Sequence, residues 1–123
     1  MASGPGYKQH PEHHVDLEHG PARVQVIFNG EIIADSTDVI TVKESDHDPV
    51  YYLPREHVKM DRLIRTDHRT YCPFKGEASY FTLSNGRTAK NAVWSYEQPY
   101  DEVAAIKGRV AFYPDKVDAI NVI

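Results

Sequence analysis

The sequence predicts a mostly β domain, a compact antiparallel structure built from hairpins with one or two short helices. Three observations lead to this class. Two Asn-Gly pairs, Asn29-Gly30 and Asn85-Gly86, each separate runs of β-branched and aromatic residues, which is the pattern of a β-hairpin. Further short apolar runs alternate with turn-forming residues. Helical signals are confined to short stretches, so the core is expected to be built on sheets.

The 123 residues are long enough for one hydrophobic core and too short for two. Residues 1–12 are rich in glycine, proline and histidine, and we expect them to form a flexible N-terminal arm. Residues 13–123 are expected to form the single β domain. Hydrophobic residues make up 41% of the chain and charged residues 26%, which is an ordinary balance for a globular protein.

The first hairpin joins "RVQVIF" to "EIIADS" through Asn29-Gly30. This pair suits a type I′ turn because both positions need a positive φ. "DVITVKE" continues as another strand. Pro54 begins a single helical turn at "PREHV", since proline fits the first position of a helix.

The second hairpin joins "ASYFTLS" to "RTAKNAVWSY". A two-residue turn at Asn85-Gly86 pairs Ser84 with Arg87, and counting back pairs Phe81 with Lys90. "YDEVAAIKG" then predicts a short helix that Asp101 caps and Gly108 ends. "RVAFY" and "VDAINVI" are expected to be the last strands.

Composition excludes several classes of function. No apolar run is long enough to span a bilayer, and the N-terminus lacks the apolar segment of a signal peptide, so we expect a soluble protein without a membrane partner. The single cysteine rules out an intramolecular disulfide and fits the cytoplasm. A formal net charge of −4 gives no electrostatic footprint for nucleic acid. An unknown small molecule or a protein is the expected partner.

The stretch "TYCPFKGEASYF" contains that cysteine, Cys72. Arg69 and Lys75 lie within three residues of it and His68 within four, a cationic setting that would activate a thiol as a nucleophile or redox group. The alternative is that Cys72 packs as a small apolar residue. In either case the proline and glycine of "CPFKG" predict a constrained bend between two strands.

Aromatic and basic residues suggest a binding site. Eight tyrosines against four phenylalanines suggest walls that carry polar tips, as ligand pockets do. The candidate wall residues are Tyr52, Tyr80, Trp94, Tyr96 and Tyr113. Their alternative role is core packing. The hairpin register places Tyr80 and Trp94 on opposite faces of the sheet, so these two should not line one pocket.

Arg55 and Lys75 are the candidate residues for orienting a polar or anionic ligand. The guanidinium of Arg55 follows two tyrosines in "YYLPREHV", and it suits a carboxylate, a phosphate or a planar polar group. A surface arginine stacked on tyrosine, and a solvated lysine in a turn, are the alternatives.

No metal site or cofactor is expected. The seven histidines include the cluster "HPEHH", but its spacing is not that of a zinc site on rigid elements. The sequence contains neither a phosphate-binding glycine loop nor a catalytic serine elbow.

Five strings in order, "VIFNGEIIADS", "YYLPREHV", "TYCPFKGEASYF", "NAVWSYEQP" and "IKGRVAFYP", closely resemble the bacterial family called domain of unknown function 427. The resemblance covers roughly residues 8–119 and implies an antiparallel domain of the β-tent type, without an agreed activity. The family pattern carries over to Tyr52, Pro54, Arg55, Cys72, Pro73, Lys75, Gly76, Tyr80, Trp94, Tyr96, Pro99, Phe112 and Tyr113. A single cysteine excludes the paired-cysteine zinc site of other β-tent proteins.

Three functions therefore remain open. The first is a module that binds a small polar or anionic ligand in a pocket lined by aromatic residues and Arg55. The second is an enzyme in which Cys72 acts as nucleophile. The third is a protein-interaction or homodimerisation domain that uses the apolar tail "VDAINVI" as an exposed edge strand.

Overall fold

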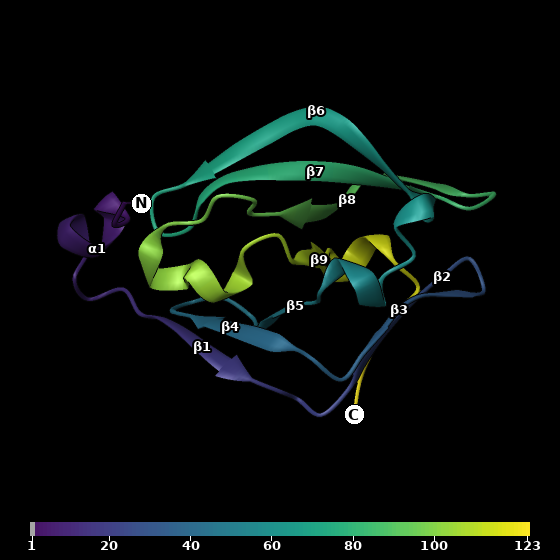
Figure 1. Cartoon of the computed structure of the whole chain (residues 1–123), viewed down its shortest axis with the longest axis horizontal. Coiled ribbons are helices and arrows are strands. Elements are labelled where there is room, and N and C mark those ends of the chain that lie inside the picture. Colours follow the sequence, from purple (N-terminus) through teal and green to yellow (C-terminus); the bar gives the residue numbers. More distant parts are fainter. Residues whose placement is uncertain (1) are drawn as a thin grey trace.

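A computed structural model describes residues 2–123 and contains three antiparallel sheets (Figure 1). The long hairpin of β6 and β7 lies along one side of the molecule, and β1 to β4 lie along the opposite side. The expected mostly β class, an antiparallel domain with short helices, is confirmed. The first sheet has the strand order β1 (Val15–His19), β4 (Ile40–Glu44), β5 (Val50–Tyr52). The second has the order β10 (Ala119–Val122), β2 (Val24–Phe28), β3 (Glu31–Ser36). The third has the order β6 (Leu63–Cys72), β7 (Gly76–Ser84), β8 (Thr88–Ser95), β9 (Val110–Phe112).

The helices are short, as expected. They are α1 (Pro5–Gln9) and the 3-10 helices η1 (Arg55–His57), η2 (Met60–Arg62), η3 (Asp101–Ile106) and η4 (Pro114–Lys116). Pro54 precedes η1 directly, in agreement with the predicted helical turn. The predicted cap of the later helix is wrong: Tyr100 occupies the N-cap of η3, and no side chain caps it, because Asp101 is already its first residue.

The first hairpin has the predicted turn. Asn29 and Gly30 have φ values of 49° and 75°, and Phe28 pairs with Glu31 across them. The left-handed conformation at both positions is what a type I′ turn requires.

The predicted register of the second hairpin is wrong. Ser84 pairs with Thr88, so the loop contains three residues instead of two. Asn91 then bulges out of β8 with a φ of 51°, and its N–H donates to Thr82 Oγ1 at 3.1 Å. These changes place Tyr80 directly opposite Trp94 and leave the two side chains on one face, contrary to the prediction.

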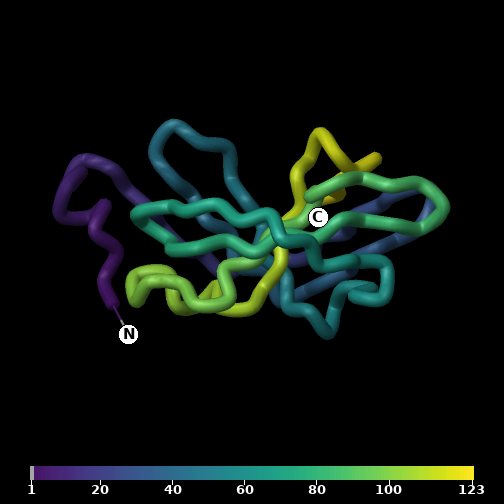
Figure 2. The backbone as a smooth tube through the Cα atoms, turned by 90° about the horizontal axis from the view of Figure 1, so that it is seen from above, coloured from purple at the N-terminus to yellow at the C-terminus, as the bar shows by residue number. Residues whose placement is uncertain are grey.

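Two buried clusters form the core. One packs β2 and β3 against the distal part of β7 and β8, with Val26, Phe28 and Leu83 near its centre. The other is rich in aromatic residues and includes Tyr52 and Trp94. Figure 2 shows the two ends of the molecule, with the β7–β8 turn beside the β2–β3 turn at one end and the N-terminal segment at the other.

The N-terminal segment lies against the β6–β7 turn. Within it, the N–H of Gly6 donates to Pro73 O at 3.0 Å, and the Tyr7 hydroxyl donates to Phe74 O at 3.0 Å. Gly4 N–H donates to the Glu102 carboxylate at 3.0 Å. The flexibility expected for residues 1–12 stays a prediction.

No helix among residues 2–123 has the length and apolar character needed to cross a membrane.

Candidate functional site

A cavity of about 610 Å³ opens between β4–β5 on one side and β7–β8 on the other. Four of its wall residues are tyrosines, and we call it the tyrosine cavity. It is lined by His13, Val42, Glu44, His47, Asp48, Pro49, Val50, Tyr52, Cys72, Pro73, Phe74, Lys75, Tyr80, Trp94, Tyr96, Tyr113 and Pro114.

All but one of the candidate site residues line this cavity. The exception is Arg55. The structure thus brings together residues from five separate stretches of the chain: Tyr52, Cys72 with Lys75, Tyr80, Trp94 with Tyr96, and Tyr113.

The aromatic walls follow from the observed register. Tyr80 and Trp94 are cross-strand partners on one face of the sheet. Tyr113 follows β9 directly, and its ring centroid lies 4.4 Å from that of Trp94 and 6.5 Å from that of Tyr80. Tyr52 meets Trp94 edge-on, with a centroid separation of 6.3 Å. These rings give the cavity flat walls that suit a planar ligand.

The hydroxyl groups of the four tyrosines differ in their hydrogen bonds. Trp94 Nε1 donates to the Tyr52 hydroxyl at 3.2 Å. The Tyr80 hydroxyl lies 2.9 Å from Thr70 Oγ1 and 3.3 Å from the Tyr113 hydroxyl. The Tyr96 hydroxyl has no hydrogen-bond partner within residues 2–123.

Burial favours the neutral form of Tyr52, Tyr96 and Tyr113. It raises the pKa of Tyr52 and of Tyr96 well above the usual value, and it does the same at Tyr113, where the hydrogen bond with Tyr80 adds to the effect. A neutral phenol both donates and accepts hydrogen bonds. The cavity therefore offers polar groups without a net charge on its aromatic walls.

A buried ion pair closes one end of the cavity. Lys75 is 6% exposed, and its ammonium group donates to Glu44 Oε1, while His13 Nε2 lies 2.7 Å from Glu44 Oε2. Burial alone would raise the pKa of Glu44, but the hydrogen bonds from Lys75 and His13 outweigh it and hold that pKa below its usual value. Glu44 thus compensates the charge of Lys75, and this end does not present a free cation.

Cys72 forms part of the cavity wall and is partly buried. It is the last residue of β6 and pairs with Gly76, the first residue of β7, across the turn. The N–H of Lys75 donates to Cys72 O at 3.3 Å within this turn. The predicted bend between two strands is confirmed.

Arg55 lies outside the cavity and joins three segments of the fold. Its Nε donates to Gly108 O at 2.7 Å, and its Nη2 donates to Ser95 Oγ at 3.1 Å and to Glu97 Oε2 at 2.9 Å. Arg65 binds both Glu97 oxygens at 2.8 Å. These contacts, with Arg65 contributing most, lower the pKa of Glu97 to about 2. The Nε and Nη2 groups of Arg55 thus donate to other parts of the protein and hold the fold together.

The cavity also contains polar residues that the sequence analysis missed, among them His13 and Glu44. Strand alternation could have found Glu44, because it follows Ile40 and Val42 at two-residue spacing and therefore shares their buried face. His13 gives no comparable signal. Among residues 2–123, no group of three or more His, Cys, Asp and Glu side chains is arranged to hold a metal ion.

The fold and the site together define a small antiparallel β domain with a tyrosine-walled cavity between its sheets. Residues 16–123 match the family model NTP_transf_9, which is described as a domain of unknown function (DUF427). The match covers nearly the whole chain, and the protein belongs to this family. No curated protein matches it.

Proposed function

We propose that the protein binds a small, planar, polar molecule in the tyrosine cavity. The observation that carries this proposal is the convergence of Trp94 and four tyrosines on one cavity, where the Tyr96 hydroxyl has no hydrogen-bond partner within residues 2–123. Concave sites with aromatic walls and a few polar groups are typical of small-molecule binding.

The chemistry of the walls favours a polar ligand over an anionic one. The rings of Trp94 and Tyr113 would contact the flat faces of the ligand, and the Tyr96 hydroxyl would exchange a hydrogen bond with its edge. An anion would need a free cation, but Lys75 is paired with Glu44 and Arg55 lies outside the cavity.

Titration with a defined panel of benzamide, nicotinamide, uracil and adenine tests this function. Trp94 is the only tryptophan of the chain, so its fluorescence reports occupancy of the cavity directly. We expect saturable binding of at least one compound, weakened by Tyr96→Phe and unchanged by Tyr71→Phe, whose exposed hydroxyl bonds to the Tyr100 hydroxyl outside the cavity. Absence of saturable binding across the panel would contradict the proposal.

An enzyme that uses Cys72 is the second candidate, supported by the position of this thiol in the same cavity as Lys75 and Tyr96. A nucleophilic thiol in a binding site should react with iodoacetamide faster in the folded protein than in the unfolded chain. Intact mass measured over time on both states checks this. Reaction only after unfolding would leave Cys72 a packing residue.

Two further expectations remain proposals. The single cysteine, which excludes an intramolecular disulfide, supports a cytoplasmic location. Homodimerisation through the C-terminal strand is supported by the position of β10 at the edge of its sheet, with Val122 48% exposed. Sedimentation at several dilutions tests it, and a monomer at every concentration would contradict it.

A further inference from the structure

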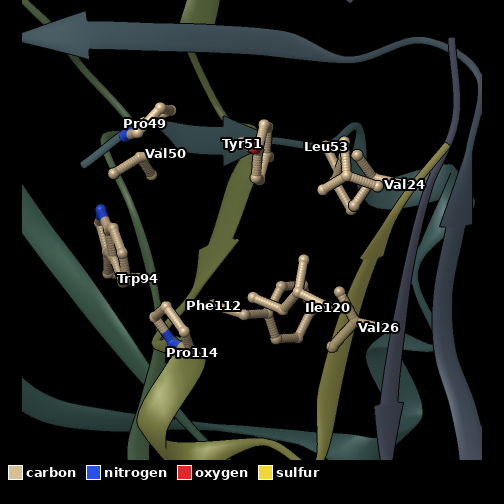
Figure 3. Close-up of a pocket in the computed structure, with 11 residues that line it drawn as sticks. Val24, Val26, Pro49, Val50, Tyr51, Leu53, Trp94, Phe112, Pro114 and Ile120 are labelled. Atoms are coloured by element: carbon tan, nitrogen blue, oxygen red, sulfur yellow. The ribbon is translucent and has the colours of Figure 1, made fainter. Parts of the chain in front are cut away.

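A second, smaller cavity of about 270 Å³ lies next to the tyrosine cavity and differs from it in chemistry (Figure 3). We call it the apolar groove. Aliphatic and aromatic carbon dominates its walls, and none of its lining residues carries a charge. The residues that line the groove and not the tyrosine cavity include Val24, Val26, Leu53, Phe112, Ile120 and Val122.

The two cavities share one wall. Pro49, Val50, Trp94 and Pro114 line both of them. In Figure 3 these four residues lie at one end of the groove, while Val24 and Val26 lie at the other. A molecule that rests against Trp94 in the tyrosine cavity therefore lies next to the groove.

We propose that the natural ligand is amphipathic, with a planar polar head in the tyrosine cavity and a short apolar tail in the apolar groove. This inference rests on the proposed function and specifies the class of ligand. The polar groups of the first cavity and the apolar walls of the second match the two parts of one such molecule. Burying the tail removes its apolar surface and that of the groove from water.

A shared wall favours the tail of the same ligand over a separate occupant. A second molecule in the groove would also contact Trp94 and Val50, so two separate molecules would bind against the same two side chains. One covalently joined ligand fills both cavities and loses its translational and rotational freedom only once.

A series of 4-alkylbenzamides, from methyl to hexyl, tests the inference through Trp94 fluorescence. Each added methylene that enters the groove is expected to tighten binding by roughly three- to fourfold. The increase should stop when the groove is filled. Benzamide itself measures the contribution of the head.

Two variants fill the groove from different positions of β10 and keep the test independent of folding. Ile120→Phe adds a ring in the groove, and Val122→Phe adds one at its more exposed rim. Both are expected to abolish the dependence on chain length while benzamide binding persists. Ile123→Phe is the matched control, because Ile123 is 63% exposed and does not line the groove.

The outcomes separate the two proposals. Benzamide binding with no gain along the alkyl series would overturn the amphipathic ligand and leave the proposed function standing. A gain that persists unchanged in both filled variants would place the tail elsewhere and would also overturn it. Self-association that hides the groove and disappears in Val122→Phe would assign the groove to a second copy of the chain. No saturable binding of any member would contradict the proposed function itself.

Discussion

At the scale of single residues, Tyr52 and Tyr96 show how similar side chains in one cavity can have different roles. The Tyr52 hydroxyl accepts a hydrogen bond from Trp94 Nε1 inside the core. The Tyr96 hydroxyl has no partner within residues 2–123 and is available to a ligand. The first group supports the fold, and the second is suited to binding.

Phenylalanine substitutions separate these roles. Tyr52→Phe leaves the indole N–H of Trp94 without its acceptor, so we expect the free energy of unfolding to fall by about 1–3 kcal/mol. Tyr96→Phe removes no hydrogen bond within residues 2–123, and we expect a change of less than about 0.5 kcal/mol. Urea denaturation checks both, and equal losses would show that the Tyr96 hydroxyl already has a partner.

The Lys75–Glu44 pair is buried, and its loss should be costly. Lys75→Met leaves the Glu44 carboxylate without its main partner, so we expect the free energy of unfolding to fall by about 3–5 kcal/mol. The double variant Lys75→Met/Glu44→Gln should recover much of this loss. Arg69→Met, which breaks an exposed pair with Glu77, is the control and should cost less than about 1 kcal/mol.

Glu97 should contribute to stability in acid. Its pKa is about 2 in the folded protein, because Arg65 and Arg55 bind the carboxylate, against an ordinary value of 4.5. A lowered pKa stabilises the folded state above pH 4.5, and this contribution is lost as the pH falls toward 2. Urea midpoints between pH 7 and pH 2 should therefore fall less steeply in Glu97→Gln than in the wild type. Glu56→Gln, at an exposed position of η1, is the control, and an unchanged slope in Glu97→Gln would contradict the assignment.

At the scale of elements, α1 depends on one close approach. A Cβ atom at Gly6 would lie 2.8 Å from the Phe74 ring, which is closer than carbon atoms can pack. Phe74 in turn stacks on His13, with ring centroids 4.3 Å apart. The glycine therefore allows the helix to lie on the β6–β7 turn beside the tyrosine cavity.

Gly6→Val should detach α1 without unfolding the sheets. We expect faster hydrogen exchange across residues 2–12, measured by mass spectrometry, and no change in β7. Lys8→Val adds the same side chain at an exposed position of the same helix and should leave exchange near the wild-type rate. Equal protection in the two variants would show that the contact with Phe74 does not hold the segment.

The two hairpins show which part of the fold local sequence determines. Asn29-Gly30 forms the expected type I′ turn because the residues themselves favour a positive φ. The similar pair Asn85-Gly86 does not, and the Asn85 side chain instead donates to Phe28 O in the neighbouring hairpin at 2.9 Å. A contact between distant segments accompanies this different turn, and counting along one hairpin could not reveal it.

At the scale of the whole molecule, the cavity could be predicted from the sequence only in part. The aromatic content was enough to select Tyr52, Tyr80, Trp94, Tyr96 and Tyr113 as candidates, but the predicted register wrongly separated Tyr80 from Trp94. The role of Arg55 could not be inferred, because its partners Gly108, Ser95 and Glu97 are brought to it by tertiary structure. The apolar groove could not be predicted either, because its walls come from strands of all three sheets and are brought together by tertiary structure.

Amide and indole NMR shifts, recorded with benzamide, nicotinamide, uracil and adenine, would show directly whether the tyrosine cavity is the binding site. We expect saturable shifts that centre on Trp94, Tyr96 and Lys75, and none at Arg55. Tyr96→Phe should weaken them, whereas Tyr71→Phe should not. Shifts that centre on Arg55 and Glu97, or no saturable shift with any compound, would contradict the assignment of the tyrosine cavity as the binding site.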